Sequence, residues 1–184
     1  MLRFVAQLLV GLSLGGMVLA GQQPGVWLDV PFVRQDKNGC GAASIAMVMQ
    51  YWHRQQGNVP SADPEQIQRA LYSRPAQGIY ASDMERYFQQ HGFRTFAFAG
   101  EWKDLKEHLE KGRPLIVALN PGGSDLHYVV VAGLDWQQGV VLKNDPAERK
   151  LLKQGRANFE KEWKAAGNWT LLAVPQPGDH GSLP

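Results

Sequence analysis

Apolar residues recur with a helical period after a polar, glycine-containing loop at residues 35–41. Four of them fall at i, i+3, i+4 and i+7 and form one helix face: Ile45, Val48, Met49 and Trp52. This spacing predicts a helix that starts at Cys40 and buries that face, together with Met47, in the core. The Cys40 thiol is therefore expected at or near a helix N-terminus.

Three further segments carry helix signals. Asp63 followed by Pro64 supplies an N-cap residue and a proline at the first helical position. The sequence Ser82–Glu85 has the form of a capping box and predicts a helix that Gly92 can end. A shorter helical pattern covers residues 102–111.

The second half of the chain is mainly strand-like. Apolar or alternating runs that suit strands occupy residues 94–99, 114–119, 127–132, 139–143 and 169–174. One or two helical turns are predicted between Phe159 and Trp163. Helices first and an antiparallel sheet second indicate an α+β domain.

The N-terminal residues 1–20 have the form of a secretory signal peptide. Arg3 precedes a long apolar stretch, and Val18 and Ala20 place small residues at the positions that a signal peptidase recognises. The alternative is an uncleaved membrane anchor, because the apolar stretch approaches the length that crosses a bilayer. We expect a protein exported across the inner membrane, periplasmic or secreted, or else tethered through this segment.

Length and charge limit the remaining possibilities. The 184 residues, 44% of them hydrophobic, suit one folded domain, which we place at residues 21–175, followed by a loose Pro/Gly-rich tail at 176–184. A formal net charge of +2 without a basic run argues against nucleic acid as a partner. We expect a monomer.

Cys40 is the one cysteine of the chain, so an internal disulfide is impossible. Most free cysteines are small buried hydrophobes, and this is the alternative to a reactive thiol. A helix N-terminus stabilises a thiolate, and an adjacent imidazole stabilises it further and carries a proton. A nucleophilic role therefore requires a histidine from elsewhere in the chain.

Of the five histidines, His127 is the best candidate. His53 lies too far along the predicted first helix, His180 lies in the tail, and His91 and His108 fall in helical patterns that indicate the surface. His127 stands at the first position of a strongly apolar strand. Alone, it could equally be a strand-end histidine that bonds a backbone carbonyl.

Asp145 is the candidate carboxylate behind that histidine. If Ala132 pairs with Val140 across the intervening loop, the register places His127 opposite Asp145. Directly opposed residues have Cβ atoms roughly 4.5–5.5 Å apart, close enough for a carboxylate to bond the ring. A slip of one residue would turn the two side chains to opposite faces. Asp145 could otherwise be a turn residue before Pro146.

Acyl transfer also needs donors for an oxyanion. The backbone N–H of Cys40 is one candidate, and the side-chain amide of Gln35 is the second. Asp36 is an acceptor and has the wrong polarity. Metal-ligand spacing and a phosphate-binding loop are both lacking, so we expect no metal and no cofactor. The segment Pro121–Ser124 is instead predicted to form a lip beside His127.

Three motifs together resemble a known family. Residues 35–44, 127–131 and 144–147 are similar to those of the bacteriocin-processing cysteine peptidases, papain-fold proteins classified as cysteine peptidase family 39. The resemblance extends over residues 30–175. It implies a papain-like fold with the nucleophile at a helix start, and a sheet that carries histidine and aspartate.

The resemblance also implies roles for single residues. Gln35 matches the oxyanion-hole glutamine, Cys40 the nucleophile, His127 the base and Asp145 the third member of the triad. Gly39 stands where the family often has aspartate. The best-known members belong to ABC exporters and cut leaders after a double glycine, whereas this sequence shows no transporter segment, so leader cleavage is not implied.

Three functions remain open at this stage. The first is a thiol peptidase that acts on an extracytoplasmic peptide or protein. The second is an amidase or acyltransferase with the same nucleophile, and the third is a non-catalytic peptide-binding module. The set of Gln35, Cys40, His127 and Asp145 favours an enzyme over the third.

Overall fold

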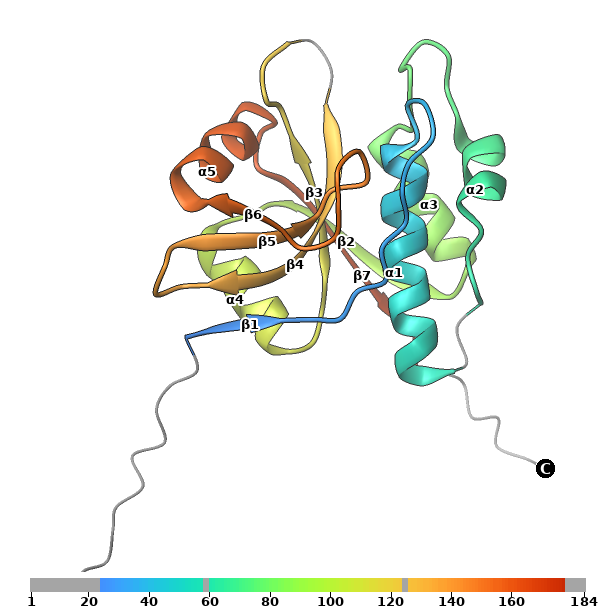
Figure 1. Ribbon diagram of the computed structural model, residues 1–184. Helices are drawn as coiled ribbons and strands as arrows, with labels where there is room; N and C mark the ends of the chain where they lie inside the picture. Colours follow the sequence, from blue (N-terminus) through green and yellow to red (C-terminus); the bar gives the residue numbers. More distant parts are fainter. Residues whose placement is uncertain (1–23, 58–59, 124–125, 178–184) are drawn as a thin grey trace, which may run out of the picture.

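The computed structural model describes residues 24–57, 60–123 and 126–177, and Figure 1 shows its arrangement. The helices are α1 (Cys40–Gln56), α2 (Pro64–Leu71), α3 (Ala81–Gln90), α4 (Trp102–Glu110) and α5 (Arg156–Ala165). The strands are β1 (Gly25–Trp27), β2 (Phe93–Ala99), β3 (Leu115–Leu119), β4 (His127–Asp135), β5 (Val140–Asn144), β6 (Leu152–Gly155) and β7 (Trp169–Pro175). The predicted α+β class is therefore confirmed.

All seven strands form one antiparallel sheet in the order β2-β7-β3-β4-β5-β6, with β1 added beside β4. Strand β4 is the centre of the sheet. Along one edge it pairs first with β3 and then with β1, and along the other edge it pairs with β5. The short strands β1 and β6 were not predicted as separate elements, since neither carries a long alternating pattern.

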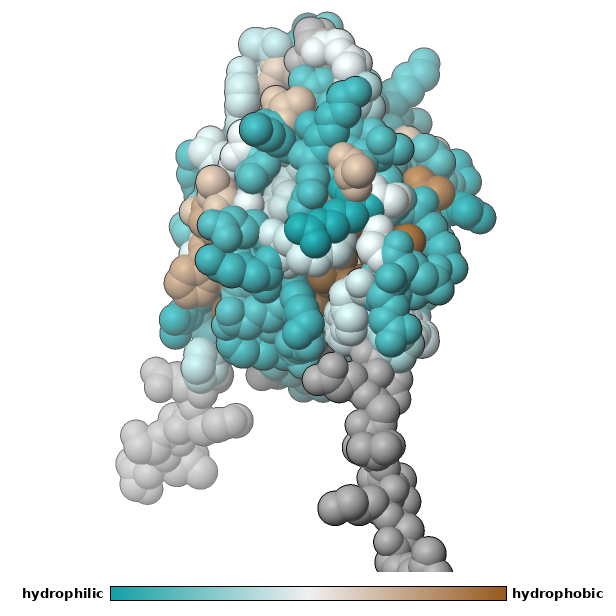
Figure 2. Space-filling model, turned by 90° about the vertical axis from the view of Figure 1, so that its left-hand side faces the viewer, coloured by the Kyte–Doolittle hydropathy of each residue, from teal (hydrophilic) through white to brown (hydrophobic). Residues whose placement is uncertain are grey.

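Helices cover both sides of the sheet. Helices α1, α2 and α3 lie together on one side and α4 and α5 on the other (Figure 1). Each side has its own hydrophobic cluster, one built around Ile45, Met47 and Phe88, the other around Leu105, Val131 and Trp163. The face that carries α4 and α5 is mostly hydrophilic, with small scattered apolar spots (Figure 2).

Helix α1 begins where the sequence predicts. Its first residue is Cys40, and Ile45, Val48, Met49 and Trp52 are all buried, as expected. Helix α2 also has the predicted start, because the Asp63 side chain accepts a hydrogen bond from the backbone N–H of Glu65 at 2.9 Å.

The predicted capping box of the third helix is wrong. Helix α3 starts at Ala81, so Ser82 lies inside it, and Tyr80 is the N-cap residue. The Tyr80 carbonyl accepts from the backbone N–H groups of Asp83 and Met84. A preceding bridge between Ser73 and Gly78 fixes the chain just before this point. Helix α3 therefore starts before the predicted cap, and the Tyr80 carbonyl, not the Ser82 side chain, accepts its first N–H groups.

The predicted register between β4 and β5 is also wrong. Val130 pairs with Asn144 and Val131 with Lys143, and the register then shifts at a bulge before Gly133 pairs with Leu142. Asp145 lies just past the last register pair of β5. A bulge inserts a residue into one strand, and loop symmetry in a sequence gives no sign of it.

No helix within the described ranges is long and apolar enough to cross a membrane. The predicted signal segment 1–20, and the predicted tail from residue 178 onward, lie outside the described residues.

Candidate active site

The Cys40 thiol stands at the N-terminus of α1 and is half-buried. The first turn of α1 contains no acidic residue and is built from Gly41, Ala42 and Ala43. The positive end of the helix dipole therefore lies at the residue that carries the sulfur, with no acidic side chain in the first turn to compete. This environment stabilises a negative charge on the sulfur.

Gly39 closes the tight turn that precedes Cys40. Its N–H donates to the Asp36 carbonyl at 2.9 Å, and a Cβ at this position would lie 2.9 Å from the same oxygen. Such an approach is too short for a side chain without a shift of the loop. The resembled family often has aspartate at this position. Here the close packing of the turn favours glycine.

His127 and Asp145 form a direct hydrogen bond. His127 is the first residue of β4, and its Nε2 lies 2.7 Å from Oδ1 of Asp145. The same Oδ1 accepts from the backbone N–H of Ala147 at 3.1 Å, which holds the carboxylate at the start of a turn. Because Nε2 faces the carboxylate, Nδ1 is the ring nitrogen left for the thiol.

Two partners raise the proton affinity of His127. Burial by itself lowers the pKa of the ring, but hydrogen bonds to Asp145 and Cys40 outweigh burial and raise the pKa to about 9. The ring therefore interacts with the thiol on one side and the carboxylate on the other. The structure brings together these three sequence-predicted residues.

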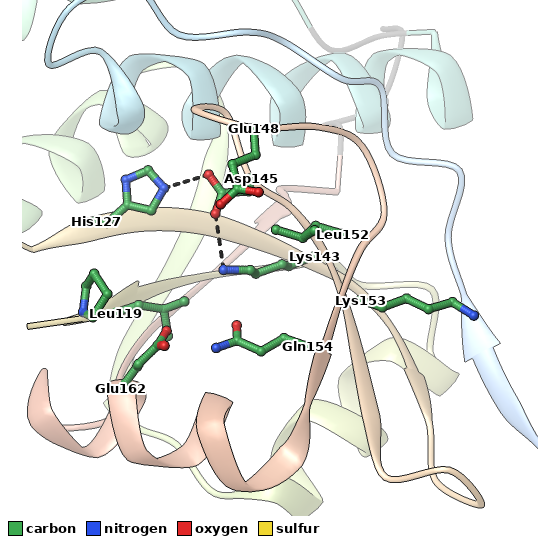
Figure 3. Close-up of a pocket in the computed structure, with 10 residues that line it drawn as sticks. Leu119, His127, Lys143, Asp145, Glu148, Leu152, Lys153, Gln154 and Glu162 are labelled. Atoms are coloured by element: carbon green, nitrogen blue, oxygen red, sulfur yellow. Dashed lines mark hydrogen bonds and ion pairs between the residues drawn. The ribbon is translucent and has the colours of Figure 1, made fainter.

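Asp145 stays ionised although it is buried. Burial raises the pKa of its carboxyl group, but the hydrogen bond and charge of His127, followed by those of Lys143, bring the pKa down to about 2. The Lys143 ammonium lies 3.1 Å from Oδ2, on the side of the carboxylate away from the histidine (Figure 3). Sequence reasoning missed Lys143, because a lysine near the end of a strand usually indicates a solvated position.

Gln35 reaches the same site from the loop before α1. Its backbone N–H donates to the Pro146 carbonyl at 3.0 Å, which ties this loop to the turn that carries Asp145. Its side-chain oxygen is buried without a hydrogen-bond partner. Gln35, Cys40 and His127 line one cleft.

That cleft has a volume of about 760 Å³. Its other walls come from three segments, residues 76–81, residues 121–123 and residues 126–128. Tyr80 and Leu126 are exposed large hydrophobic residues on its rim. Pro121, Gly122 and Gly123 lie beside His127, where a lip was predicted, whereas Ser124 is outside the described residues.

Asn144 is a second residue that the sequence did not single out. It is fully buried, and its Nδ2 donates to the carbonyls of Val30 and Pro31 at 3.1 and 3.3 Å. Its Oδ1 accepts from the backbone N–H of Leu151 at 2.9 Å. Asn144 thus joins the chain segment leading to Gln35 to the loop that follows Asp145.

Two of the remaining histidines differ from expectation. His91 stacks on Tyr87 with ring centroids 4.0 Å apart, and its Nδ1 lies 2.7 Å from the Tyr87 carbonyl oxygen. His108 is half-buried, and burial lowers its pKa. Both were predicted at the surface. Aromatic packing and helix packing, which a helical pattern of polar neighbours does not reveal, account for the difference.

Comparison with known proteins identifies a family that matches this chain and solved structures that have a similar fold. The family described as "Peptidase_C39 like family" matches residues 27–171, most of the chain. No curated relative matches the sequence.

Three solved structures illustrate the fold similarity. A C39-like peptidase from Bacillus anthracis has a TM-score of 0.67 at 19% identity, covering 83% of this chain and 98% of its own. The peptidase domain of Streptococcus ComA, a bi-functional ABC transporter involved in quorum sensing, has a TM-score of 0.65 at 21% identity, covering 80% and 99%. A double glycine motif protease from an AMS/PCAT transporter, in complex with the leader peptide, has a TM-score of 0.65 at 24% identity, covering 82% and 95%. The papain-like fold expected from the motifs is thereby confirmed.

Proposed function

Because this chain belongs to the Peptidase_C39 like family, and is a cysteine-type peptidase, we propose that it hydrolyses peptide bonds of an extracytoplasmic peptide or protein. Family membership confirms the resemblance that the three sequence motifs indicated. The proposal assigns the nucleophile to Cys40, the base to His127, the orienting carboxylate to Asp145 and an oxyanion donor to Gln35.

One observation carries the assignment of roles. His127 lines one cleft with Cys40 and at the same time bonds the Asp145 carboxylate, 2.7 Å from its Nε2. A binding module needs no such alignment of three ionisable groups, whereas a thiol nucleophile needs a base that a third group orients.

The first half of the reaction is acylation. The Cys40 thiolate attacks the carbonyl carbon of the scissile bond, and a carbon–sulfur bond forms while the carbonyl oxygen takes up negative charge. The backbone N–H of Cys40 and the Gln35 amide donate to that oxygen. His127, protonated on Nδ1, gives its proton to the leaving nitrogen as the carbon–nitrogen bond breaks, and the amine product departs.

The second half is hydrolysis of the thioester. Neutral His127 takes a proton from a water molecule, whose oxygen attacks the thioester carbon. The carbon–sulfur bond breaks, the acid product leaves and the thiolate–imidazolium pair is restored. Through both halves Asp145 accepts from the Nε2–H, which keeps the ring oriented and favours its charged form.

Peptide substrates are supported by the shape of the cleft. Three separate segments form its walls, and exposed Tyr80 and Leu126 on its rim offer apolar contacts to side chains next to the cut. The solved double glycine motif protease in complex with a leader peptide makes such a peptide the first substrate to try.

Export rests on the N-terminal segment. Its single early charge, apolar stretch and Val-x-Ala ending at Ala20 have the form of a cleaved signal. Expression of the full chain, followed by fractionation and N-terminal sequencing, tests this part. A periplasmic or secreted product starting at Gly21 supports it, and an intact chain in the cytoplasm contradicts it.

The activity is tested with two probes, a peptide library and a synthetic leader peptide that contains a double glycine. The wild-type protein should cut at least one, and Cys40→Ala and His127→Ala should each abolish cutting while circular dichroism shows an unchanged fold. Cutting by Cys40→Ala would remove the assignment. Transfer of the acyl group to an added amine in preference to water would favour the acyltransferase alternative, and binding without turnover would favour the peptide-binding module.

A further inference from the structure

A lysine is buried directly behind the Asp145 carboxylate. Lys143 is only 6% exposed and Asp145 only 3%, and Lys143 Nζ lies 3.1 Å from Oδ2. Of the ion pairs recorded within the described residues, Lys143 takes part in this one alone. The two carboxylate oxygens are thus divided, with Oδ1 toward His127 and Oδ2 toward Lys143 (Figure 3).

The sheet holds the stem of Lys143 in place. Lys143 pairs with Val131 on β4 and with Leu152 on β6, so apolar residues flank it on both sides. Its ammonium forms its ion pair with Asp145, although other carboxylates line the same pocket. A buried ammonium without a partner is costly, which makes this pairing persistent rather than one of several surface options.

Other charges face the same pocket of about 280 Å³. Glu148, Lys153 and Glu162 line it together with His127, Lys143 and Asp145. Lys153 is exposed and points away from Asp145, whereas the Lys143 ammonium points at it (Figure 3). Lys153 is therefore a matched control, because it is a lysine of the same pocket whose ammonium points away from Asp145.

We propose that Lys143 is a positioning residue of the active site. It holds Oδ2 of Asp145, so that the carboxylate keeps its charge and its Oδ1 stays turned toward His127. This inference rests on the proposed roles of Cys40, His127 and Asp145. The Lys143 ammonium on Oδ2 and the Ala147 N–H on Oδ1 limit rotation of the carboxylate about its Cβ–Cγ bond. Lys143 acts through Asp145 and touches neither thiol nor substrate.

Removal of the lysine has a defined consequence. In Lys143→Met the buried carboxyl keeps only His127 and the Ala147 N–H, so its pKa rises. The thiolate–imidazolium pair then loses its orienting charge at a higher pH than in the wild-type protein. For a shift of about one pKa unit, thiol reactivity on the acid side falls about tenfold.

The test uses iodoacetamide alkylation of Cys40, which needs no substrate, over pH 2 to 9, a range that includes the pKa of about 2 of Asp145. We expect Lys143→Met to move the acid limb of the alkylation rate upward by about one unit, and Lys153→Met to leave it in place. In an Asp145→Asn background, Lys143→Met should change the rate less than twofold, because its effect passes through that carboxylate. A merely structural role would instead add the same loss in both backgrounds.

The outcomes separate this inference from the function on which it depends. If the wild-type thiol reacts like an ordinary one, the triad fails, and this inference with it. If wild type and Asp145→Asn behave as expected while Lys143→Met matches wild type within twofold, or is equally harmful in both backgrounds, only the role of Lys143 is overturned. Should Lys143→Met not fold, Lys143→Gln, which keeps a donor but removes the charge, must show the same upward shift.

Discussion

His127 and Asp145 meet at 2.7 Å although they are not register partners in the sheet. Extrapolation of the observed pairing would put Val129, not His127, opposite Asp145. Residues two apart on a strand share a face, and a diagonal neighbour remains within reach of a long side chain. The ladder also ends at Asn144, so Asp145 is free to turn toward the ring.

Asp145→Asn should leave a weakly active enzyme. The amide can occupy the same place but carries no charge and favours the wrong ring tautomer, so we expect kcat to fall by roughly 10²- to 10⁴-fold yet stay above that of Cys40→Ala. Asp29→Asn, which alters an exposed carboxylate paired with Lys150, is the control and should leave kcat unchanged. Full activity of Asp145→Asn on a cleaved peptide would contradict a role for this carboxylate.

Stability should depend on pH through the same pair. The pKa of Asp145 is lowered from 3.8 to about 2, so its contribution is present above pH 3.8 and is lost as pH falls through 2. The pKa of His127 is raised from 6.5 to about 9, so its contribution is complete below pH 6.5 and is lost as pH rises through 9.

Each contribution is on the order of 2 kcal/mol, with the attraction that the two groups share counted once. Urea unfolding between pH 2 and pH 10 measures it. The free energy of unfolding should decline at both ends, and Asp145→Asn should flatten both declines. Equal pH dependence in wild type and Asp145→Asn would show that the pair is not coupled to folding.

The pairing of Lys143 with Asp145 predicts a compensation between two mutations. Asp145→Ala leaves a buried ammonium without its counter-charge, which typically costs about 3–5 kcal/mol. The double variant Asp145→Ala/Lys143→Met removes the ammonium as well and should regain most of that loss in chemical denaturation. Additive losses in the double variant would mean that the two side chains do not interact.

Gly39→Ala should harm the site through the loop. A Cβ would lie 2.9 Å from the Asp36 carbonyl oxygen, so the turn that carries Gln35 has to shift. We expect a loss of about 1 kcal/mol in stability and a clear fall in kcat/KM. Gly155→Ala is the matched control, since its φ is −63° and no atom lies within 4 Å of the added Cβ. Equal effects of the two substitutions would contradict the proposed tight approach.

The elements that sequence predicts well here are those fixed by local signals. Helix α1 follows from its periodic apolar face, and α2 from Asp63 and Pro64. Strand β6 escaped prediction because it has only four residues, and the start of α3 was misplaced because the Tyr80 carbonyl, not the Ser82 side chain, accepts its first N–H groups. Local patterns thus failed where an element is short or is capped by the backbone alone.

At the functional site, too, residues in recognisable motifs were predicted, whereas residues placed by sheet pairing were not. Cys40, His127, Asp145 and Gln35 were predicted from chemistry and motif spacing, and the structure gathers them at one cleft and the turn behind it. Lys143 was not predicted, and Asn144 was noted only as part of a motif, because their burial depends on sheet pairing that one sequence does not specify. The bulge between Val131 and Gly133, which sets that pairing, leaves no sign in the local pattern of apolar residues.

The central claim is that His127 activates the Cys40 thiol. The most direct measurement is the rate of Cys40 alkylation by iodoacetamide at pH 5, in the wild-type protein and in His127→Ala. An ordinary thiol is almost wholly protonated at that pH, so fast alkylation requires a thiolate held by the imidazolium. We predict rapid labelling of the wild type and a loss of at least tenfold in His127→Ala. Equally slow labelling of both proteins, rising only where ordinary thiols ionise, would contradict the account.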